Sequence, residues 1–181
     1  MQDHEKVFRR LAVGTRQIRL PADLEGISGL ILPGGESTVM AMYLREYELD
    51  SAIGERVKAG MPVFGFCAGA ILLCSEVEGP GGRVPGALGL IEARAVRNAY
   101  GRQNASFEEE IDTELGPFPG IFIRAPRLES LGVTKIVGRR KPEHGGEAVF
   151  LRQGRILAAS FHPELSGDDR IHRMFVETCS T

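Results

Sequence analysis

Short apolar runs alternate with helix-like patterns through the first half of the chain. Apolar residues at helical spacing predict a helix over Asp3 to Leu11. The apolar run Val63 to Phe66 is short enough for a buried strand, and the residues after Gly69 favour a helix. Such alternation is typical of an α/β fold with a parallel sheet. The other elements predicted here are strands at Thr15–Leu20 and Ile27–Leu32, a helix through Met40 and Leu44, and a helix at Ser51–Ala59.

Beyond the Gly- and Pro-rich stretch Gly79 to Gly86, which predicts a surface loop, the pattern changes to short strands. An amphipathic helix over Asp169 to Glu177 closes the chain. No linker marks a second domain, so we expect residues 1–181 to form a single domain. The strands predicted in this half are Leu88–Val96, Ser106–Ile111, Ile121–Arg124, Val133–Val137, Ala148–Leu151 and Ile156–Phe161.

Composition and charge narrow the class of protein. With 43% hydrophobic and 25% charged residues, the 181-residue chain has the balance of an ordinary globular protein. Its formal net charge of -2 disfavours a module that binds nucleic acid or an anionic membrane. No apolar run reaches membrane-spanning length and the N-terminus lacks a secretory signal, which predicts a cytoplasmic protein. Three cysteines are too few for a disulfide framework or a zinc site.

The turn Gly65-Phe66-Cys67-Ala68-Gly69 has the G-x-nucleophile-x-G spacing of a nucleophile elbow. Glycines on both sides relieve crowding at a strained turn that lifts the nucleophile clear of the sheet. The backbone N–H groups and positive dipole end of the following helix favour the reactive thiolate of Cys67. The alternative is a buried cysteine beside a tight turn, as we expect for Cys74 among its leucines.

The segment Ser160 to Glu164 offers partners for a thiol. Pro163 holds His162 in extended geometry, in which residues two apart face the same way. One imidazole nitrogen can then take the thiol proton while Glu164 fixes the tautomer from the other side, which completes a Cys-His-Glu triad. The alternative is a solvated surface turn. The remaining histidines are expected to be solvated; they are His4, His144 and His172.

The loop Pro33-Gly34-Gly35-Glu36 follows another predicted strand, and in a parallel sheet it lies at the same edge as Cys67. Ser37 or Thr38 is expected to cap the helix that follows. As a site, the N–H groups of Gly35 and Ala68 would form an oxyanion hole and Glu36 would bind a substrate ammonium group. Otherwise the loop is a flexible turn with Glu36 at the positive end of the helix dipole.

Five segments together resemble the class I glutamine amidotransferases, and more closely the glutaminase subunits of pyridoxal 5'-phosphate synthase, the PdxT/SNO family. G-x-C-x-G with H-x-E marks only the wider class. Gly101-Arg102-Gln103 and Phe122-Ile123-Arg124-Ala125-Pro126 single out the narrower family. The other segments, in family order with these, are Leu-Pro-Gly-Gly-Glu-Ser-Thr at 32 to 38, Phe-Gly-Phe-Cys-Ala-Gly at 64 to 69, and Ser160-Phe161-His162-Pro163-Glu164-Leu165.

The resemblance implies an α/β three-layer sandwich with a mainly parallel central sheet, class I glutamine amidotransferase-like or flavodoxin-like. It implies hydrolysis of L-glutamine through a glutamyl thioester on Cys67, with His162 moving protons and Glu164 orienting it. Without the resemblance Arg102 and Arg124 would be surface arginines. The substrate-binding residues that it implies are Gly34, Gly35, Glu36, Ser37, Ala68, Arg102, Ile123 and Arg124.

The resemblance also implies a partner. Ammonia would pass to a TIM-barrel synthase subunit of the PdxS/SNZ family, and the glutaminase would stay nearly idle until that subunit docks and the Gly34-Gly35 peptide reorients. Pyridoxal 5'-phosphate is the product of that complex, so neither a cofactor nor a metal is expected in this chain. Two alternatives are an amidotransferase subunit that serves a different synthase and a catalytically silent interaction subunit.

The chain departs from the family at its start. Members begin with an apolar strand that ends in a Leu-Gln-Gly turn, whereas this chain begins at the helix that Asp3 and His4 open. The first strand of the family fold is therefore expected to be missing here. Because loss of a central strand would leave backbone groups unpaired, the hypothesis is that the start is misassigned and Met1 is an internal methionine.

Overall fold

The apolar run before Cys67 forms β2 (Val63–Phe66), and all four of its residues are buried. This strand lies between β1 (Leu30–Leu32) and β11 (Ile156–Ala159) and pairs with both in parallel. The carboxyl ends of three neighbouring strands therefore meet at one edge of the sheet. The three segments that carry the candidate chemistry follow these ends. The computed structural model describes residues 2–79, 82–85, 87–97, 99 and 106–180.

In the described residues, seven strands form the main sheet in the order β1-β2-β11-β10-β9-β6-β7. The expected α/β fold is confirmed, but the expectation of a mainly parallel sheet needs correction. Parallel pairing joins only β1, β2 and β11, whereas the other neighbours are antiparallel. Three of the four antiparallel pairs, β6–β7, β9–β10 and β10–β11, join strands that follow one another through short connections, which can join only antiparallel neighbours. The later strands of this sheet besides β11 are β6 (Ser106–Thr113), β7 (Gly116–Ile123), β9 (Lys135–Arg140) and β10 (Ala148–Gln153).

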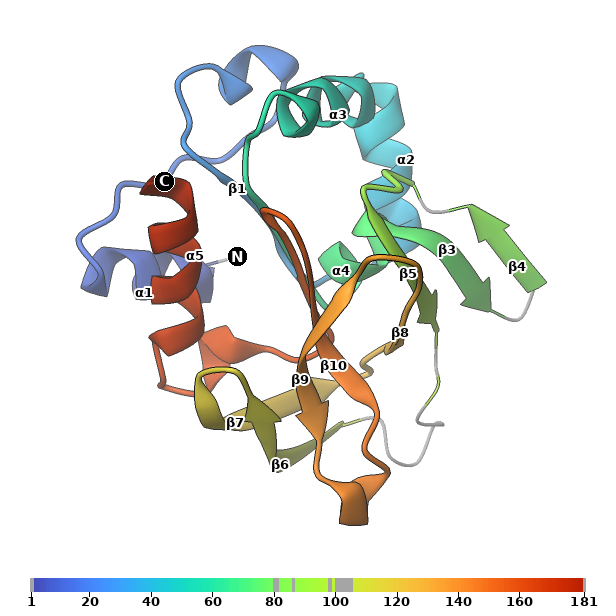
Figure 1. Cartoon of the computed structure of the whole chain (residues 1–181). Coiled ribbons are helices and arrows are strands. Elements are labelled where there is room, and N and C mark those ends of the chain that lie inside the picture. The colour runs from blue at the N-terminus through green and yellow to red at the C-terminus, as the bar shows by residue number, and fades with distance from the viewer. Residues whose placement is uncertain (1, 80–81, 86, 98, 100–105, 181) are drawn as a thin grey trace.

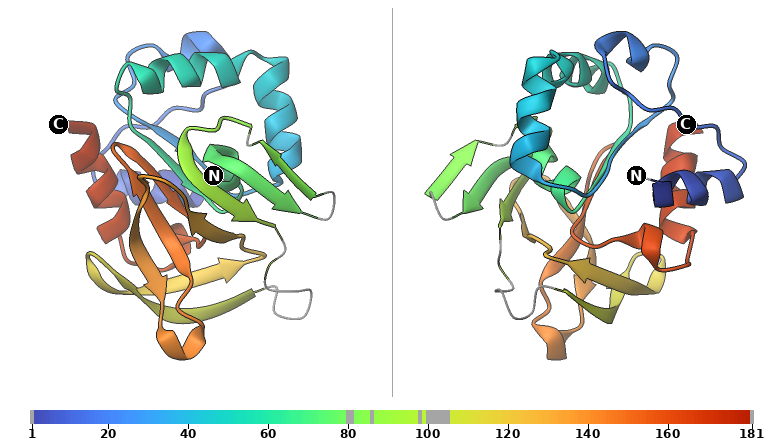
Figure 2. Two further views of the ribbon diagram at one scale, coloured as in Figure 1. Left: turned by 45° about the vertical axis from the view of Figure 1, so that its right-hand side comes forward. Right: turned by 180° about the vertical axis from the view of Figure 1, so that it is seen from behind.

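Helices cover both faces of this sheet, as the expected three-layer arrangement requires (Figure 1). Phe8, Ile171 and Phe175 of α1 and α5 pack with phenylalanines of the sheet into one buried cluster. The helices α2, α3 and α4 contribute to a second cluster with the other face. Figure 2 shows the two helical layers on opposite sides in both further views. The helices are α1 (Gln2–Arg10), α2 (Ser37–Glu46), α3 (Leu49–Lys58), α4 (Ala68–Leu73) and α5 (Arg170–Ser180).

A second sheet, with the order β4-β3-β5-β8, packs against the α4 side of the molecule. Its strands β3, β4 and β8 were not predicted, and the loop predicted over Gly79 to Gly86 is wrong for Gly82–Pro85. That segment pairs with β3 as an antiparallel hairpin, so ladder hydrogen bonds outweigh a composition that disfavours strands. The four strands are β3 (Cys74–Gly79), β4 (Gly82–Pro85), β5 (Ile91–Val96) and β8 (Arg127–Ser130).

The predicted strand Thr15–Leu20 does not form. In the described residues β1 pairs only with β2, so β1 is the edge of the main sheet. A cavity of about 1190 Å³ lies between β1 and residues 13–18, and no described strand bridges the two segments there. Because a strand needs a hydrogen-bonded neighbour, Thr15–Leu20 stays irregular despite its apolar alternation. The structure thus has an open sheet edge where the resemblance implies a further strand.

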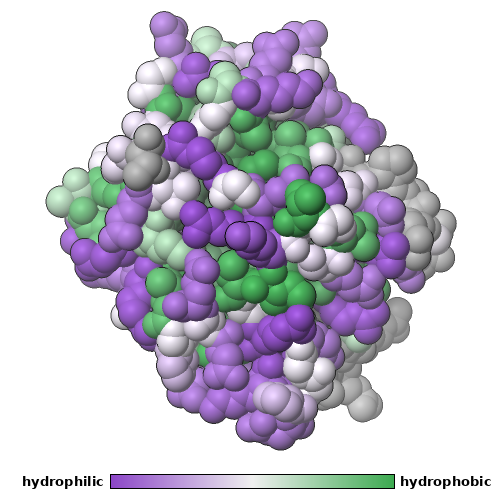
Figure 3. All heavy atoms as spheres, viewed as in Figure 1, coloured by the Kyte–Doolittle hydropathy of each residue, from purple (hydrophilic) through white to green (hydrophobic). Residues whose placement is uncertain are grey.

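In the parts of the chain that the structure describes, no helix combines the length and the apolar character needed to cross a bilayer. Figure 3 shows that polar side chains cover most of the face seen in Figure 1, while apolar surface gathers near its middle.

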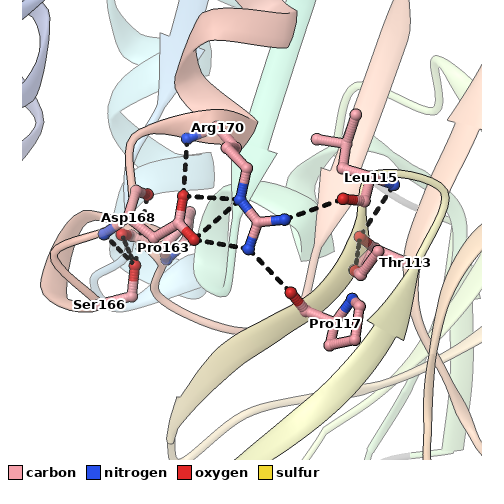
Figure 4. A network of polar contacts seen from close by, with 8 residues as sticks. Thr113, Leu115, Pro117, Pro163, Ser166, Asp168 and Arg170 are labelled. Atoms are coloured by element: carbon pink, nitrogen blue, oxygen red, sulfur yellow. Dashed lines mark hydrogen bonds and ion pairs between the residues drawn. The ribbon is translucent and has the colours of Figure 1, made fainter.

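Arg170, the first residue of α5, ties the segment after β11 to the hairpin of β6 and β7 (Figure 4). Its guanidinium donates to the carbonyl oxygens of Leu115 and Pro117, each at 2.8 Å, and to the carboxylate of Asp168 at 2.6 Å. These bonds fix the position of the short 3-10 helix η3 (Pro163–Leu165), which lies just before Asp168. The two other 3-10 helices described are η1 (Pro21–Leu24) and η2 (Pro142–His144).

Candidate active site

Cys67 stands at the junction of β2 and α4 in a strained conformation, with φ 49° and ψ -105°. A positive φ of this kind is costly for a residue with a side chain and is frequent at functional sites. A Cβ atom on Gly65 would lie 2.5 Å from the backbone of Gly69, and one on Gly69 would overlap the backbone of Leu32. The two glycines are required by close backbone approach, so the predicted elbow is present.

His162 and Glu164 meet at the end of β11. The Nδ1 atom of His162 lies 2.7 Å from Oε1 of Glu164, and both side chains are largely buried. The backbone N–H of His162 donates to the carbonyl of Ile121 at 2.8 Å, which holds the segment against β7. The expected meeting is confirmed by this distance, although Glu164 lies in the 3-10 turn η3 and not in extended chain.

The thiol, the imidazole and the carboxylate form one connected group. Burial alone would lower the pKa of His162, but hydrogen bonds with Cys67 and Glu164 outweigh it and raise the pKa from 6.5 to about 9. Burial would likewise raise the pKa of Glu164, yet its bond with His162 and the neighbouring imidazoles hold that pKa below the usual value. At neutral pH the resting site therefore contains a protonated imidazole and an ionised carboxylate.

The Gly34 to Ser37 loop lies directly beside the imidazole. A Cβ atom on Gly34 would come within 2.7 Å of Cε1 of His162, so only glycine leaves the ring in place. Sγ of Cys67 lies 3.8 Å from the carbonyl oxygen of Ile123. Ala68 opens α4 immediately after the thiol. The structure thus brings Gly34, Ala68 and Ile123 together around Cys67 and His162.

Glu36 is the N-cap of α2, a role expected from the sequence for Ser37 or Thr38. Its carboxylate accepts hydrogen bonds from the backbone N–H groups of Thr38 at 3.2 Å and Val39 at 2.8 Å, so Glu36 caps α2. The expected cap by Ser37 or Thr38 is wrong, because the longer side chain already occupies these donors. Those bonds lower the pKa of Glu36, and Arg97 lies 3.3 Å away. In this conformation the carboxylate is engaged with the protein itself.

Arg124 and Arg102 are the two arginines expected to bind substrate, and the described residues include Arg124. Arg124 follows Ile123 and has a positive φ of 46°, a second strained residue beside the site. Its side chain is exposed at the end of β7. The expected role of Arg102 falls outside the described residues. Gly35 lies in the loop next to Gly34, close enough to α2 for a Cβ atom to contact Met40 at 3.2 Å.

Two histidines expected to be solvated are buried behind the triad. The side chains of His4 and His172 lie in α1 and α5, and the two residues are 4% and 0% exposed. Nδ1 of His4 is 3.1 Å from Nε2 of His172, and Nε2 of His4 is 3.6 Å from Oε1 of Glu164. The expectation is wrong because His4 shares the apolar helical face of Phe8, a spacing that could have revealed its burial.

Burial lowers the pKa of both His4 and His172 from 6.5 to about 4, so both are neutral at physiological pH. In the described residues, no group of three or more His, Cys, Asp or Glu side chains is arranged to hold a metal ion.

These two shifts predict an acid-sensitive fold. The unfolded chain takes up a proton at each histidine near pH 6.5, whereas the folded chain does so only near pH 4. The free energy of unfolding should therefore fall by roughly 1 kcal/mol per histidine for each pH unit between pH 6.5 and about 4. The raised pKa of His162 makes the free energy of unfolding depend on pH only between pH 6.5 and about 9. It therefore does not offset the loss of stability below pH 6.5.

Urea denaturation across this pH window measures the effect. His172→Leu removes one of the two buried groups and should make the dependence shallower. An equal pH dependence in wild type and His172→Leu would contradict the assignment.

Comparison with known proteins identifies relatives of this chain. The chain is 46% identical over 178 residues to a pyridoxal 5'-phosphate synthase subunit PdxT of Thermus thermophilus, covering 97% of this chain and 91% of the relative. The PdxT subunit of Pelotomaculum thermopropionicum is 45% identical over 182 residues, which cover 98% and 89% of the two chains.

A solved structure described as a glutamine amidotransferase superimposes on the chain with a TM-score of 0.90 at 42% identity, covering 99% of this chain and 94% of that one. The glutamine amidotransferase-like α/β fold that the resemblance implied is confirmed by this match. A model of the SNO glutamine amidotransferase family matches residues 1–181. The chain belongs to the SNO glutamine amidotransferase family.

Proposed function

We propose that this chain hydrolyses L-glutamine to L-glutamate and ammonia as the glutaminase subunit of a pyridoxal 5'-phosphate synthase. The observation that carries the proposal is the strained Cys67 beside the His162 and Glu164 pair, whose Nδ1 to Oε1 distance is 2.7 Å. The relatives with 46% and 45% identity, both named as synthase subunits PdxT, support the same reaction.

The triad residues divide the chemistry between them. The Cys67 thiolate attacks the amide carbon of glutamine, and protonated His162 gives its proton to the nitrogen that leaves as ammonia. A glutamyl thioester remains on the sulfur. Neutral His162 then takes a proton from the water that attacks the thioester, and collapse of the tetrahedral intermediate releases glutamate and restores the thiolate. Glu164 keeps the imidazole in the tautomer and orientation for both transfers.

The loop and the strand end supply the binding groups in this proposal. The N–H groups of Gly35 and Ala68 stabilise the oxyanion at the attacked carbon, where one donor is worth about 10²-fold in rate. Glu36 binds the substrate ammonium group after leaving the N–H groups of α2 that its carboxylate accepts from in this structure. The other proposed contacts come from Gly34, Ser37, Arg102, Ile123 and Arg124.

Ammonia is delivered to a partner in this proposal. The acceptor is a TIM-barrel synthase subunit of the PdxS/SNZ family, and its docking moves the Gly34-Gly35 peptide and releases Glu36 from its cap. The cap bonds that Glu36 forms here support such a switch, since they occupy the carboxylate that is proposed to bind the ammonium group. The hydrolysis uses only thiol, imidazole and carboxylate groups, so the proposal includes no cofactor or metal in this chain.

Ammonia release from glutamine, measured with and without a pyridoxal 5'-phosphate synthase barrel subunit, tests the proposal. We expect little release from the chain alone and strong stimulation by that subunit. Stimulation by a different acceptor enzyme, but not by the barrel, would favour an amidotransferase that serves another synthase. No release under either condition, with binding to the barrel retained, would identify a silent interaction subunit.

A further inference from the structure

The polar contacts of the triad continue beyond Glu164. Nε2 of His4 lies 3.6 Å from Oε1 of Glu164, the oxygen that His162 also contacts. Nδ1 of His4 is in turn 3.1 Å from Nε2 of His172. Cys67, His162, Glu164, His4 and His172 thus form a continuous row, and its last two members come from α1 and α5, the helices that cover this face of the sheet.

Hydrogen-bonding needs in this row favour one arrangement of protons. A neutral imidazole has one donor and one acceptor nitrogen. If His172 donates from Nε2 to Nδ1 of His4, the proton of His4 must lie on Nε2, which faces the Glu164 carboxylate. In the described residues, three atoms of this row are buried without any hydrogen-bond partner: Nε2 of His4, Oε2 of Glu164 and Nδ1 of His172, which is the acceptor nitrogen in this arrangement. A buried donor without a partner costs stability, and a carboxylate is the group best suited to receive it.

Ring packing holds this arrangement in place. The imidazole of His4 stacks on Phe66 with ring centroids 4.6 Å apart and an interplanar angle of 29°. The imidazole of His172 stacks on the same ring at 5.6 Å and 22°. Phe66 directly precedes Cys67, so the two histidines contact both ends of the triad: the elbow through Phe66 and the carboxylate through His4.

We propose that His4 is a positioning residue for the hydrolysis, donating from Nε2 to Glu164 and so holding the carboxylate against His162, while His172 sets the tautomer of His4. The contact of 3.6 Å in the substrate-free structure shortens to a hydrogen bond in the reacting complex, as catalytic hydrogen bonds commonly do. This inference rests on the proposed function, because it assigns a role within the same reaction.

The charged groups around His4 and His172 do not change the positioning role of His4. His4 faces Glu164 and His162 across the helix interface and Asp3 on its own helix, and His172 faces Asp169 and Arg10. Burial outweighs these charges and keeps both imidazoles neutral above about pH 4. His4 therefore acts as a neutral hydrogen-bond donor and not as a second cation beside His162.

Substitutions at His4 separate positioning from packing. His4→Phe keeps an aromatic ring to stack on Phe66 but removes the N–H group. His4→Gln keeps an N–H group at a similar reach but removes the ring. The matched control is His144→Phe at the half-exposed position of η2, remote from the triad. Thermal unfolding of each variant reports separately on any loss of stability.

The main readout is the pKa of His162, measured by NMR titration of labelled histidine without substrate. The chain has 4 histidines, so the variants themselves assign the signals. We expect His4→Phe to lower the pKa of His162 by about one unit, because a displaced carboxylate stabilises the imidazolium less. His4→Gln should restore most of the shift. His172→Phe leaves His4 in place and should also lower the pKa of His162. This variant replaces His4→Phe in the test if His4→Phe does not fold.

Glutamine turnover with the synthase partner is the second readout. We expect His4→Phe to lower kcat roughly tenfold with little change in KM, and His4→Gln to retain most of the rate. The proposal is overturned if His4→Phe or His172→Phe leaves the pKa of His162 unchanged, or if His4→Gln loses as much as His4→Phe. Because the NMR titration needs no glutamine, absence of turnover in the wild-type protein would reject the proposed function without deciding the role of His4.

Discussion

Cys67→Ala is expected to lower glutamine hydrolysis by at least about 10⁴-fold while the protein stays folded. Alanine removes the atom that forms the thioester, and His162 and Glu164 without a nucleophile have no acyl group to transfer. Because Cys67 lies at the end of β2 and loses only a sulfur atom, thermal unfolding should change little. The rate is measured as glutamate formed in the presence of the synthase subunit.

Cys179→Ala provides the matched control. Cys179 is a half-buried cysteine in the last turn of α5, next to Gly29, which lies at the opposite end of β1 from the Gly34 loop. The same substitution there should leave the rate unchanged. Equal rates for Cys67→Ala and wild type would refute the triad. Equal losses in both variants would trace the effect to cysteine removal in general and not to the elbow.

Gly69→Ala is expected to have the largest effect on stability. A Cβ atom at this position would lie 2.6 Å from the carbonyl carbon of Leu32, which is backbone and cannot rotate away. Separating α4 from β1 should lower the free energy of unfolding by roughly 3 kcal/mol. The same displacement moves Cys67 relative to His162. A misplacement of about 1 Å at a reacting group costs about 10²-fold in rate. Chemical denaturation and the glutaminase assay measure the two losses.

The control for this substitution is Gly54→Ala in the middle of α3. A Cβ atom at Gly54 meets nothing within 4 Å, and alanine is the better helix former, so the variant should gain up to about 1 kcal/mol. A Gly69→Ala protein as stable as Gly54→Ala would contradict the close packing of the elbow against β1.

The parts of the site that follow from local spacing could be predicted from the sequence. The elbow depends on residues within one turn, Gly65, Cys67 and Gly69, and the close approach of Gly65 to the backbone of Gly69 is set by the turn itself. The meeting of His162 and Glu164 likewise follows from two positions separated by one proline. The parallel strands β1, β2 and β11 could be predicted because buried parallel strands form continuous apolar runs.

Features that depend on distant partners could not be predicted in the same way. The burial of His172 results from contact with His4, 168 residues away, and neither helix alone indicates a polar partner. Glu36 caps α2 in competition with Ser37 and Thr38, and the reach of its side chain in the folded loop decides the outcome. Thr15–Leu20 has a strand-like pattern but lacks a neighbour, because β1 pairs only with β2 in the described residues.

Trapping of the acyl intermediate tests the central claim most directly. The protein and its synthase partner are mixed with labelled glutamine, quenched in acid during turnover, and digested for mass spectrometry of the peptide that contains Cys67. The account predicts a glutamyl group on the Cys67 sulfur that is absent from Cys67→Ala. Steady release of ammonia without any glutamyl group on that peptide, at a rate that Cys67→Ala retains, would contradict it.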